Sequence, residues 1–252
     1  MDCLSTVATK YHPPVVTDPA VALPEVVPGP SDLSVAHFNV LISNRQYDKM
    51  VAKARNTGAD FMSFQEVNAE WAEALENGLK STYPYYFLLP SDSYFGMAVF
   101  SRFPLHNVET FTTRQVPNLV GDIEVGDSTI HFLAAHTYSP TKPWKYRQRN
   151  RHIEALADYL DAIDGPKIAV GDFNSVPWDH ALEDFRHQTA LQDSRTSWSA
   201  TYPSWLSIAG IPIDYIFFSP ELDCLEFRVV HDTNSDHHGI VSRFRLPAEA
   251  SG

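Results

Sequence analysis

The sequence predicts a layered α/β or α+β sandwich in one large domain. Apolar runs of strand length alternate with amphipathic segments of helix length from Leu33 to about Leu246. The strand-like runs outnumber the helix-like segments, and no obvious internal repeat interrupts them. A chain of 252 residues can bury a substantial core, and sheet-based domains often reach this size. We therefore expect a single domain over residues 32–247.

The two ends of the chain differ from this domain in composition. Residues 1–31 are dense in Pro and Val and lack helical periodicity, so we expect an extended or disordered leader there. Residues 248–252 are expected to form a short tail.

Strands are predicted where β-prone apolar residues follow one another without helical spacing. In chain order these segments are 33–42, 60–64, 96–101, 128–137, 167–171, 213–219, 225–230 and 239–246. The stretch "EVGDST" (124–129) has the composition of a hairpin-like turn between strands.

Four helices are predicted between the strands, over 47–58, 69–79, 146–163 and around 178–187. Gly58 is a natural C-cap for the first helix, and the second is expected to end near Gly78. The third is the longest, with apolar residues spaced along one face: Ile153, Leu156, Ala157 and Leu160.

The composition excludes several classes of protein. Hydrophobic residues make up 44% of the chain and charged residues 20%, as in ordinary globular proteins. The net charge of −12 argues against a broad, nonspecific grip on polyanions, although a local cation or metal can still dominate a site. Cys3 and Cys224 form no disulfide framework and leave the compartment open. We expect a soluble monomer without a membrane span or a signal peptide, unless the chain is a fragment of an anchored or exported protein.

Polar side chains follow many of the predicted strands at the point where the apolar run ends. Such positions let a rigid sheet present side chains to one shared site. Taken singly, each could be an ordinary loop or rim residue. The set comprises Asn39, Gln65, Glu66, His136, Asp172, Asn174, Asp214, Asp236 and His237.

The chemistry of this set is more specific than that of its members. Carboxylate and amide oxygens are the hard ligands that Mg²⁺ or Mn²⁺ accepts. No Cys/His cluster has zinc spacing, despite 11 histidines. The histidines suit charge stabilisation and proton transfer at a phosphoryl centre. Asp172 and Asn174 are two residues apart, and in an extended strand end their side chains would leave on the same side.

Seven motifs in this order resemble the endonuclease/exonuclease/phosphatase superfamily, which has the fold of DNase I. They are "FNVL", "FQEV", "GMAVFSRFPL", "AHT", "GDFN", "IDYIF" and "SDHHGI", and they span residues 39–240. The resemblance implies a DNase I-like four-layer α/β sandwich, with two packed, mostly antiparallel sheets flanked by helices. Within the superfamily the chain looks most like the compact bacterial YafD-like branch, whose members often carry membrane segments ahead of the catalytic domain.

The resemblance also implies a role for each matching residue. Glu66 resembles the principal metal ligand, with Asn39 beside it and Asp236 as a further ligand. Asp172 is expected to position or deprotonate the attacking water, and Asn174 to help hold the phosphate or the nucleophile. His136 is expected to contact phosphate oxygens. Asp214 is expected to orient the ring of His237, which faces the phosphate. Gln65 is expected to support the site from behind.

One position departs from the family pattern. Some nucleases of the family have a second acid two residues after the first Asn, where this chain has Leu41. The departure favours one tightly held Mg²⁺ over a two-metal arrangement.

Two segments bear on the substrate. Residues 141–152 carry basic side chains and no acids, so Lys145, Arg147 and Arg151 could grip phosphates or simply face water on a helix. Arg149 is left out of this set because its place in the helix suits a structural salt bridge. Trp205 lies in a loop before Asp214 and could line the substrate site or pack on the core.

The sequence therefore predicts an Mg²⁺- or Mn²⁺-dependent phosphoester hydrolase with nucleic acid as the favoured substrate. A phosphorylated lipid or inositol is the rival substrate. A binding module that kept the fold and lost catalysis is the alternative from another class, although the complete set of site residues argues against it.

Overall fold

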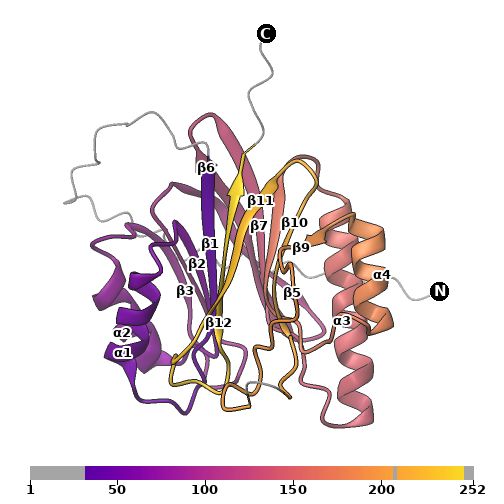
Figure 1. Cartoon of the computed structure of the whole chain (residues 1–252), viewed down its shortest axis with the longest axis horizontal. Helices are drawn as coiled ribbons and strands as arrows, with labels where there is room; N and C mark the ends of the chain where they lie inside the picture. The colour runs from indigo at the N-terminus through magenta and orange to yellow at the C-terminus, as the bar shows by residue number, and fades with distance from the viewer. Residues whose placement is uncertain (1–31, 207–208, 247–252) are drawn as a thin grey trace.

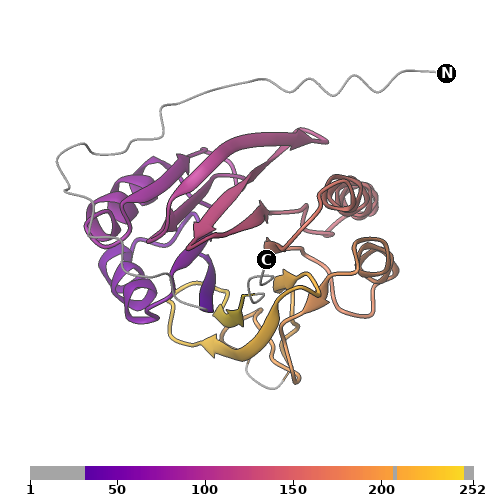
Figure 2. The same cartoon turned by 90° about the horizontal axis from the view of Figure 1, so that it is seen from above.

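The structure is a computed structural model and describes residues 32–206 and 209–246. Two six-stranded sheets pack face to face, and a pair of helices covers the outer face of each sheet (Figures 1 and 2). The layers run helices, sheet, sheet, helices, which confirms the predicted four-layer sandwich. The expected leader and tail lie outside the described residues.

The first sheet has the strand order β11-β12-β1-β2-β4-β3. Its strands are β1 (Asp32–Asn39), β2 (Phe61–Gln65), β3 (Tyr85–Leu89), β4 (Met97–Ser101), β11 (Asp223–Val230) and β12 (Gly239–Arg245). Helices α1 (Tyr47–Asn56) and α2 (Ala69–Leu79) cover this sheet.

The second sheet has the strand order β5-β6-β7-β8-β10-β9. Its strands are β5 (Leu105–Thr113), β6 (Val116–Val125), β7 (Ser128–Ala135), β8 (Lys167–Asp172), β9 (Gln192–Asp193) and β10 (Asp214–Phe218). Helices α3 (Pro143–Asp161) and α4 (His180–Thr189) cover its outer face.

Both sheets are mostly antiparallel, as predicted, and each contains one parallel pair. In the first sheet β1 pairs in parallel with β2, and α1 makes the crossover between them. In the second sheet β7 pairs in parallel with β8, and α3 makes the crossover. A parallel pair needs such a crossover because both strands must run the same way. The carboxyl ends of each parallel pair therefore meet at one edge of their sheet.

The core is divided into three apolar layers. The largest lies between the sheets and includes Phe61 of β2 and Phe132 of β7, whose ring centroids are 5.0 Å apart. A second layer joins α1 and α2 to the first sheet, and a third joins α3 and α4 to the second sheet. The central position of both sheets explains why β2, β4, β8 and β10 are buried along their whole length.

Most of the predicted strands and helices are confirmed, with two differences. β1 ends at Asn39, and Leu41 has a left-handed backbone (φ 60°), so "VLI" turns away from the sheet. The sequence patterns also missed four strands, which are β3, β5, β6 and β9. The second helix ends at Leu79, near Gly78 as expected, and Gly78 lets Val51 of α1 approach closely. Among the described residues, no helix has the length and apolar character needed to cross a membrane.

Candidate active site

The polar residues at the strand ends gather at one edge of the sandwich, the lower edge in Figure 1. The carboxyl ends of β1 and β2 supply Asn39 and Glu66, and those of β7 and β8 supply His136 and Asp172. The loop before β12 adds His237 to this group. Each sheet thus contributes the end of its parallel pair to the same site.

Glu66 and Asn39 form the first part of the site. The amide Nδ2 of Asn39 donates to Oε1 of Glu66 at 3.1 Å, and the backbone N–H of Ile42 donates to Oε2 at 3.0 Å. Glu66 is buried and has a left-handed backbone (φ 64°), which is unusual for a residue with a Cβ. Such conformations cluster at functional sites, where the surrounding structure holds them. Both oxygens of Glu66 keep a lone pair for another ligand, because each accepts one of these bonds.

Gln65 connects the two sheets directly beneath the site. Its Oε1 accepts a bond from the backbone N–H of Asp172 at 2.9 Å, and its Nε2 donates to the carbonyl of Ala135. Gly171 makes this approach possible, because a Cβ there would clash with both the Ala135 carbonyl and the Gln65 amide. Its φ of 147° is also one that L side chains rarely adopt. Gln65 therefore lies where the sequence predicted a supporting residue.

Asp172 and Asn174 are neighbours, but not for the predicted reason. β8 ends at Asp172, and Asn174 has a left-handed backbone (φ 47°), so strand alternation does not apply to the pair. Instead the carboxylate of Asp172 accepts the backbone N–H of Asn174 at 2.8 Å, which closes an Asx turn. The Asn174 amide donates to the carbonyl of Thr137 at 3.0 Å. The turn holds both side chains at the mouth of the site.

His136 lies beside the same carboxylate. Its Nε2 is 3.6 Å from Oδ2 of Asp172, and its Nδ1 is 2.9 Å from the carbonyl oxygen of Tyr94. Burial lowers the pKa of His136 below its ordinary value. A neutral ring that donates from Nδ1 to Tyr94 leaves the lone pair of Nε2 facing the site.

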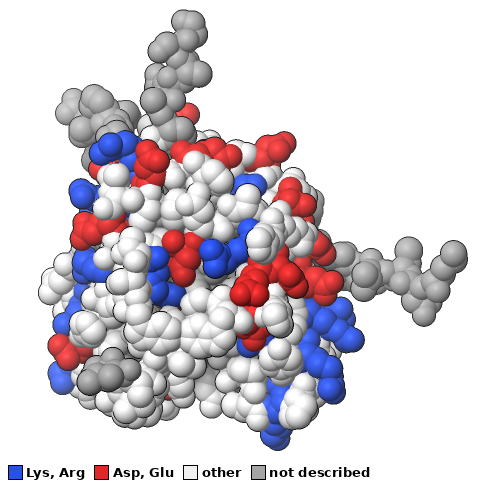
Figure 3. Space-filling model, turned by 45° about the vertical axis from the view of Figure 1, so that its right-hand side comes forward, with Lys and Arg blue, Asp and Glu red and all other residues white. Residues whose placement is uncertain are grey.

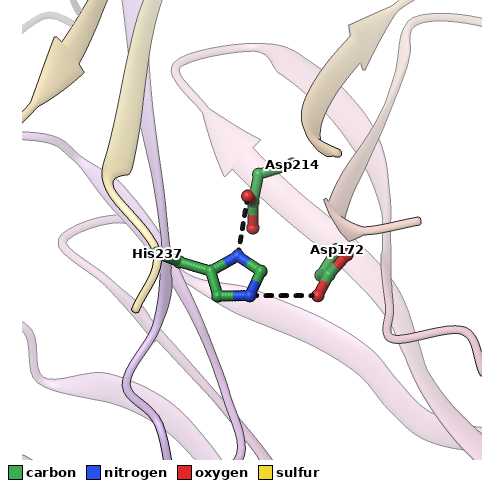
Figure 4. A group of neighbouring side chains, drawn as sticks. All are labelled: Asp172, Asp214 and His237. Atoms are coloured by element: carbon green, nitrogen blue, oxygen red, sulfur yellow. Dashed lines mark hydrogen bonds and ion pairs between the residues drawn. The ribbon is translucent and has the colours of Figure 1, made fainter. Parts of the chain in front are cut away.

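His237 lies between two carboxylates, which come from neighbouring strands of the second sheet (Figure 4). Its Nδ1 is 2.9 Å from Oδ2 of Asp214, and its Nε2 is 3.7 Å from Oδ2 of Asp172. Asp214 and Asp172 are register partners in β10 and β8, which is why their side chains meet. The ring of Tyr202 packs on His237 with centroids 4.9 Å apart.

This arrangement shifts the pKa values of all three residues. Burial alone would lower the pKa of His237, but the charges of Asp214 and Asp172 raise it to about 10. Burial raises the pKa of Asp172 to about 6, although the charge of His237 works in the opposite direction. Burial would also raise the pKa of Asp214, but the charge and hydrogen bond of His237 hold it below its usual range. At neutral pH the site therefore pairs the Asp214 anion with the His237 cation, and the neighbouring carboxyl of Asp172 has a pKa of about 6.

The two residues on either side of His237 are placed differently. Asp236 is half-buried, and burial together with the charge of Glu66 raises its pKa, against the charge of His237. The negative charges of Asp236 and Glu66 therefore act on each other. The ring of His238 is directed to His231 instead, with Nε2 at 3.3 Å from Nδ1 of His231.

The basic residues at the start of α3 lie on two faces of the helix. Lys145 lies one helical turn before the buried Arg149, so these two share a helix face. Arg147 and Arg151 are also one turn apart and point to a different, exposed face. Figure 3 shows Lys and Arg side chains gathered at the lower right, at the end of the molecule where α3 begins.

Arg149 joins α3 to the site loop, as its exclusion from the patch anticipated. Its Nη1 donates to the carbonyl of Asn174 at 2.9 Å, and its Nη2 to Asp179 at 2.6 Å. Lys145 is therefore on the face of α3 that carries the contact with the site, whereas Arg147 and Arg151 are not.

Several tryptophan side chains are exposed on segments that adjoin the site in the chain. Trp205 is 71% exposed, and its loop is tied to the site because Ser204 donates to the carbonyl of Asp236 at 2.7 Å. Trp178 and Trp198 stack on each other at the surface, with centroids 5.5 Å apart, and line a pocket of about 350 Å³. Trp144 at the start of α3 is also exposed. Trp205 therefore does not pack on the core.

One residue of the site, His37, escaped the sequence analysis. It lies on β1, 3.2 Å from Asp214. It carried a usable signal, because residues 37 and 39 of a strand share one face and Asn39 was already a candidate. Tyr202 belongs to the same loop as Trp205, which was expected to line the substrate site or to pack on the core, and its contact with His237 brings that loop to the site.

Comparisons with known proteins identify the family of the chain. A sequence model described as "Endonuclease/Exonuclease/phosphatase family" matches residues 36–237. No curated protein matches the chain. Among solved structures, the chain is similar to an endonuclease/exonuclease/phosphatase from Beutenbergia cavernae DSM 12333, with 18% identity, a TM-score of 0.70, and coverage of 88% of this chain and 73% of that one.

Two further structures have similar folds. TDP2 of D. rerio, solved with a single-strand DNA product, is 16% identical with a TM-score of 0.71, over 85% of this chain and 99% of that one. The mannosyl-6-phosphatase Bt3783 of Bacteroides thetaiotaomicron VPI-5482 is 19% identical with a TM-score of 0.70, over 84% and 99%. At these identities the likeness establishes the fold, and the match over residues 36–237 establishes the family. The chain belongs to the endonuclease/exonuclease/phosphatase family.

Proposed function

We propose that this protein is a divalent-metal-dependent phosphodiesterase whose favoured substrate is nucleic acid. The observation that carries the proposal is the arrangement of Asp214, His237 and Asp172. They form a buried acid–imidazole–acid series at the edge of the sandwich where the strands end. Membership of a family of phosphoester hydrolases supports the same reaction class.

The residues at the mouth suit a hard cation such as Mg²⁺ or Mn²⁺. Glu66, Asn39 and Asp236 offer oxygen donors, and Glu66 keeps lone pairs on both oxygens. Asp172, Asp214 and His237 also place ligand atoms within 4.8 Å of one another. Both oxygens of Asp214 are already engaged with imidazole nitrogens, however, at 3.2 and 2.9 Å. We therefore assign the ion to Glu66, Asn39 and Asp236, where it would neutralise charge on the phosphoryl oxygens.

The remaining residues have roles at the phosphorus atom. Asp172 orients the attacking water and accepts its proton, and a pKa of about 6 leaves it mostly ionised at neutral pH. The water oxygen forms a bond to phosphorus, the bond to the leaving oxygen breaks, and that oxygen takes a proton from solvent. His237 remains positively charged beside the phosphate and stabilises the negative charge of the transition state. Asn174 holds a phosphate oxygen from the second sheet through its amide, and the lone pair of His136 Nε2 accepts a hydrogen bond from the attacking water.

The surface around the site favours nucleic acid as the substrate. Lys145 lies on the site-facing side of α3, and Trp205, Trp144 and the Trp178–Trp198 stack present exposed rings. Aromatic rings and nearby cations are what a single strand needs for base stacking and phosphate contact. The solved TDP2 structure with a single-strand DNA product has the same fold. Exposed tryptophans can also contact a lipid surface, so a phosphorylated lipid or inositol is the second candidate.

A substrate panel tests the proposal. Single-stranded DNA, plasmid DNA, phosphoinositides and bis(p-nitrophenyl) phosphate would be incubated with Mg²⁺ or Mn²⁺, with Asp172→Ala as the inactive control. Hydrolysis of DNA and the small diester by the wild-type protein alone supports the proposal. Cleavage of phosphoinositides only would select the second candidate. Absence of hydrolysis on every substrate, with retained DNA binding, would instead identify a binding module.

A further inference from the structure

His37 is a histidine in the interior of the first sheet, near the end of β1. It is fully buried, and its Nε2 lies 3.2 Å from Oδ1 of Asp214 on the opposite sheet. This contact crosses the interface between the sheets, because β1 and β10 belong to different sheets. It is a second imidazole on the carboxylate that holds His237.

The carboxylate of Asp214 is thereby held at both ends. Oδ1 faces His37 and Oδ2 faces Nδ1 of His237 at 2.9 Å. An ionised carboxylate only accepts hydrogen bonds, so the Nε2 of His37 must carry the proton in this contact. Rotation of the Asp214 side chain would break both bonds at once. The orientation that Asp214 imposes on His237 therefore depends on His37.

The fold itself gives little reason for a histidine at this position. The other ring nitrogen of His37, Nδ1, has no hydrogen-bond partner among the described residues. Its register partner on β2, Ser63, also has a buried hydroxyl without a partner. Burying an unpaired polar atom is unfavourable, and an apolar side chain would avoid this cost. Among the described residues, the one hydrogen-bond partner of the His37 ring is Asp214.

We propose that His37 is a positioning residue, which fixes the Asp214 carboxylate through its Nε2–H so that Asp214 keeps His237 aligned with the phosphate. The proposal rests on the proposed phosphoester hydrolysis and adds a third member to the Asp214–His237 pair. His37 does not touch the substrate, because it is fully buried behind Asp214. Its removal should therefore affect turnover more than substrate binding.

Two substitutions separate the hydrogen bond from the packing. His37→Leu keeps a similar volume and removes the donor, whereas His37→Gln places an amide N–H at a reach similar to that of Nε2. On bis(p-nitrophenyl) phosphate, we expect His37→Leu to lower kcat roughly tenfold or more with KM little changed, since small misalignments cost this much. His37→Gln should recover most of the loss. A purely structural role would not distinguish the two variants when both are equally folded by circular dichroism.

A double-mutant comparison tests whether His37 acts through Asp214. In an Asp214→Ala background, His37→Leu should produce no further loss of kcat, because the group that it positions is gone. A readout independent of activity is the ¹H–¹⁵N NMR signal of the His237 Nδ1–H. That signal should be observed in the wild type and in His37→Gln, and should be shifted or broadened in His37→Leu.

The outcomes separate failure of this inference from failure of the proposed function. If the wild type hydrolyses no phosphoester, the proposed function is wrong, and the NMR signal still tests the positioning contact. If the wild type is active and His37→Leu retains full kcat with an unchanged His237 signal, His37 has no positioning role. Additive losses of His37→Leu and Asp214→Ala would also overturn the inference.

Discussion

The adjacent imidazoles of His237 and His238 leave the chain towards different partners. His237 turns inward to Asp214, with Nδ1 at 2.9 Å, whereas His238 turns to His231 and lines a pocket of about 210 Å³ with Trp198 and Leu206. His237 ends a bend and His238 immediately precedes β12, and of the two rings only that of His237 reaches the site.

The first prediction follows from this divergence. His237→Ala should lower kcat by roughly 10²-fold or more, the scale of losing a group that stabilises charge in the transition state. His238→Ala should leave kcat on bis(p-nitrophenyl) phosphate close to that of the wild type. Steady-state kinetics of the two variants provide the check. A larger loss for His238→Ala would mean that the catalytic histidine has been assigned to the wrong residue.

The second prediction concerns the metal. Glu66→Gln removes one negative charge at nearly constant shape, so it should weaken Mn²⁺ binding by about tenfold or more and lower activity with it, because ligand charge sets affinity. Binding would be measured by calorimetry with Mn²⁺ as the probe. Glu70→Gln, an exposed change in the first turn of α2, is the matched control. EDTA should abolish activity, and added Mg²⁺ should restore it. Full activity in a metal-stripped sample is the result that contradicts this assignment.

The third prediction divides the basic residues of α3. Lys145→Ala should raise KM for single-stranded DNA and flatten its salt dependence, because fewer phosphate contacts release fewer counterions. Changing Arg147 and Arg151 to Ala should have the smaller effect, since they do not share the helix face of Arg149, which contacts the site loop. A small diester should be insensitive to all three changes, as should DNA to the control variant Lys49→Ala/Arg55→Ala on α1. Equal losses on DNA and the small diester would show that these residues support the fold instead.

The fourth prediction concerns protonation of His237 in the metal-free protein. A pKa of about 10 means that the ring still carries its proton at pH 8, where an ordinary histidine is neutral. An NMR titration of the ring should show a midpoint far above 6.5, and Asp214→Asn should lower that midpoint. A wild-type midpoint near the ordinary value would contradict the ion pair.

The raised pKa of His237 also determines how the free energy of unfolding changes with pH. Because the folded-state pKa of His237 is raised, the ion pair stabilises the protein fully below about pH 6.5 and loses this contribution as pH rises towards about 10. Urea unfolding of the metal-free protein should therefore give a smaller free energy at pH 9.5 than at pH 6.5. The difference should shrink in His237→Gln, which has no titrating ring at this position.

The sequence predicted the fold well because strand and helix patterns here follow local burial. Strands such as β2 and β8 are buried on both faces and appear as continuous apolar runs. β5 was missed because it is largely exposed and shows no such run. β6 was missed although much of it is buried, because Pro117 and Gly121 interrupt its apolar pattern.

The site was predictable in membership and less so in geometry. Strand-end positions and motif order identified residues that the structure brings together, from Asn39 to His237. The Asx turn at Asn174 was not visible, because a left-handed backbone at a non-glycine residue leaves little trace in the sequence. The opposing faces of Lys145 and Arg147 were visible in the helical spacing and were overlooked. The cross-sheet contact of His37 with Asp214 depends on packing alone.

The Gln65 bridge has a consequence for how the protein tolerates change. The site is divided between two sheets, and Gln65 with Gly171 sets the distance between the two halves. A volume change at the remote Phe61–Phe132 contact would alter the spacing between the sheets and so the separation of Glu66 from Asp172. A small change of core volume should therefore lower kcat before it lowers the melting temperature. Hydrostatic pressure and core mutations would both act on catalysis in this way, through the spacing of the two sheets.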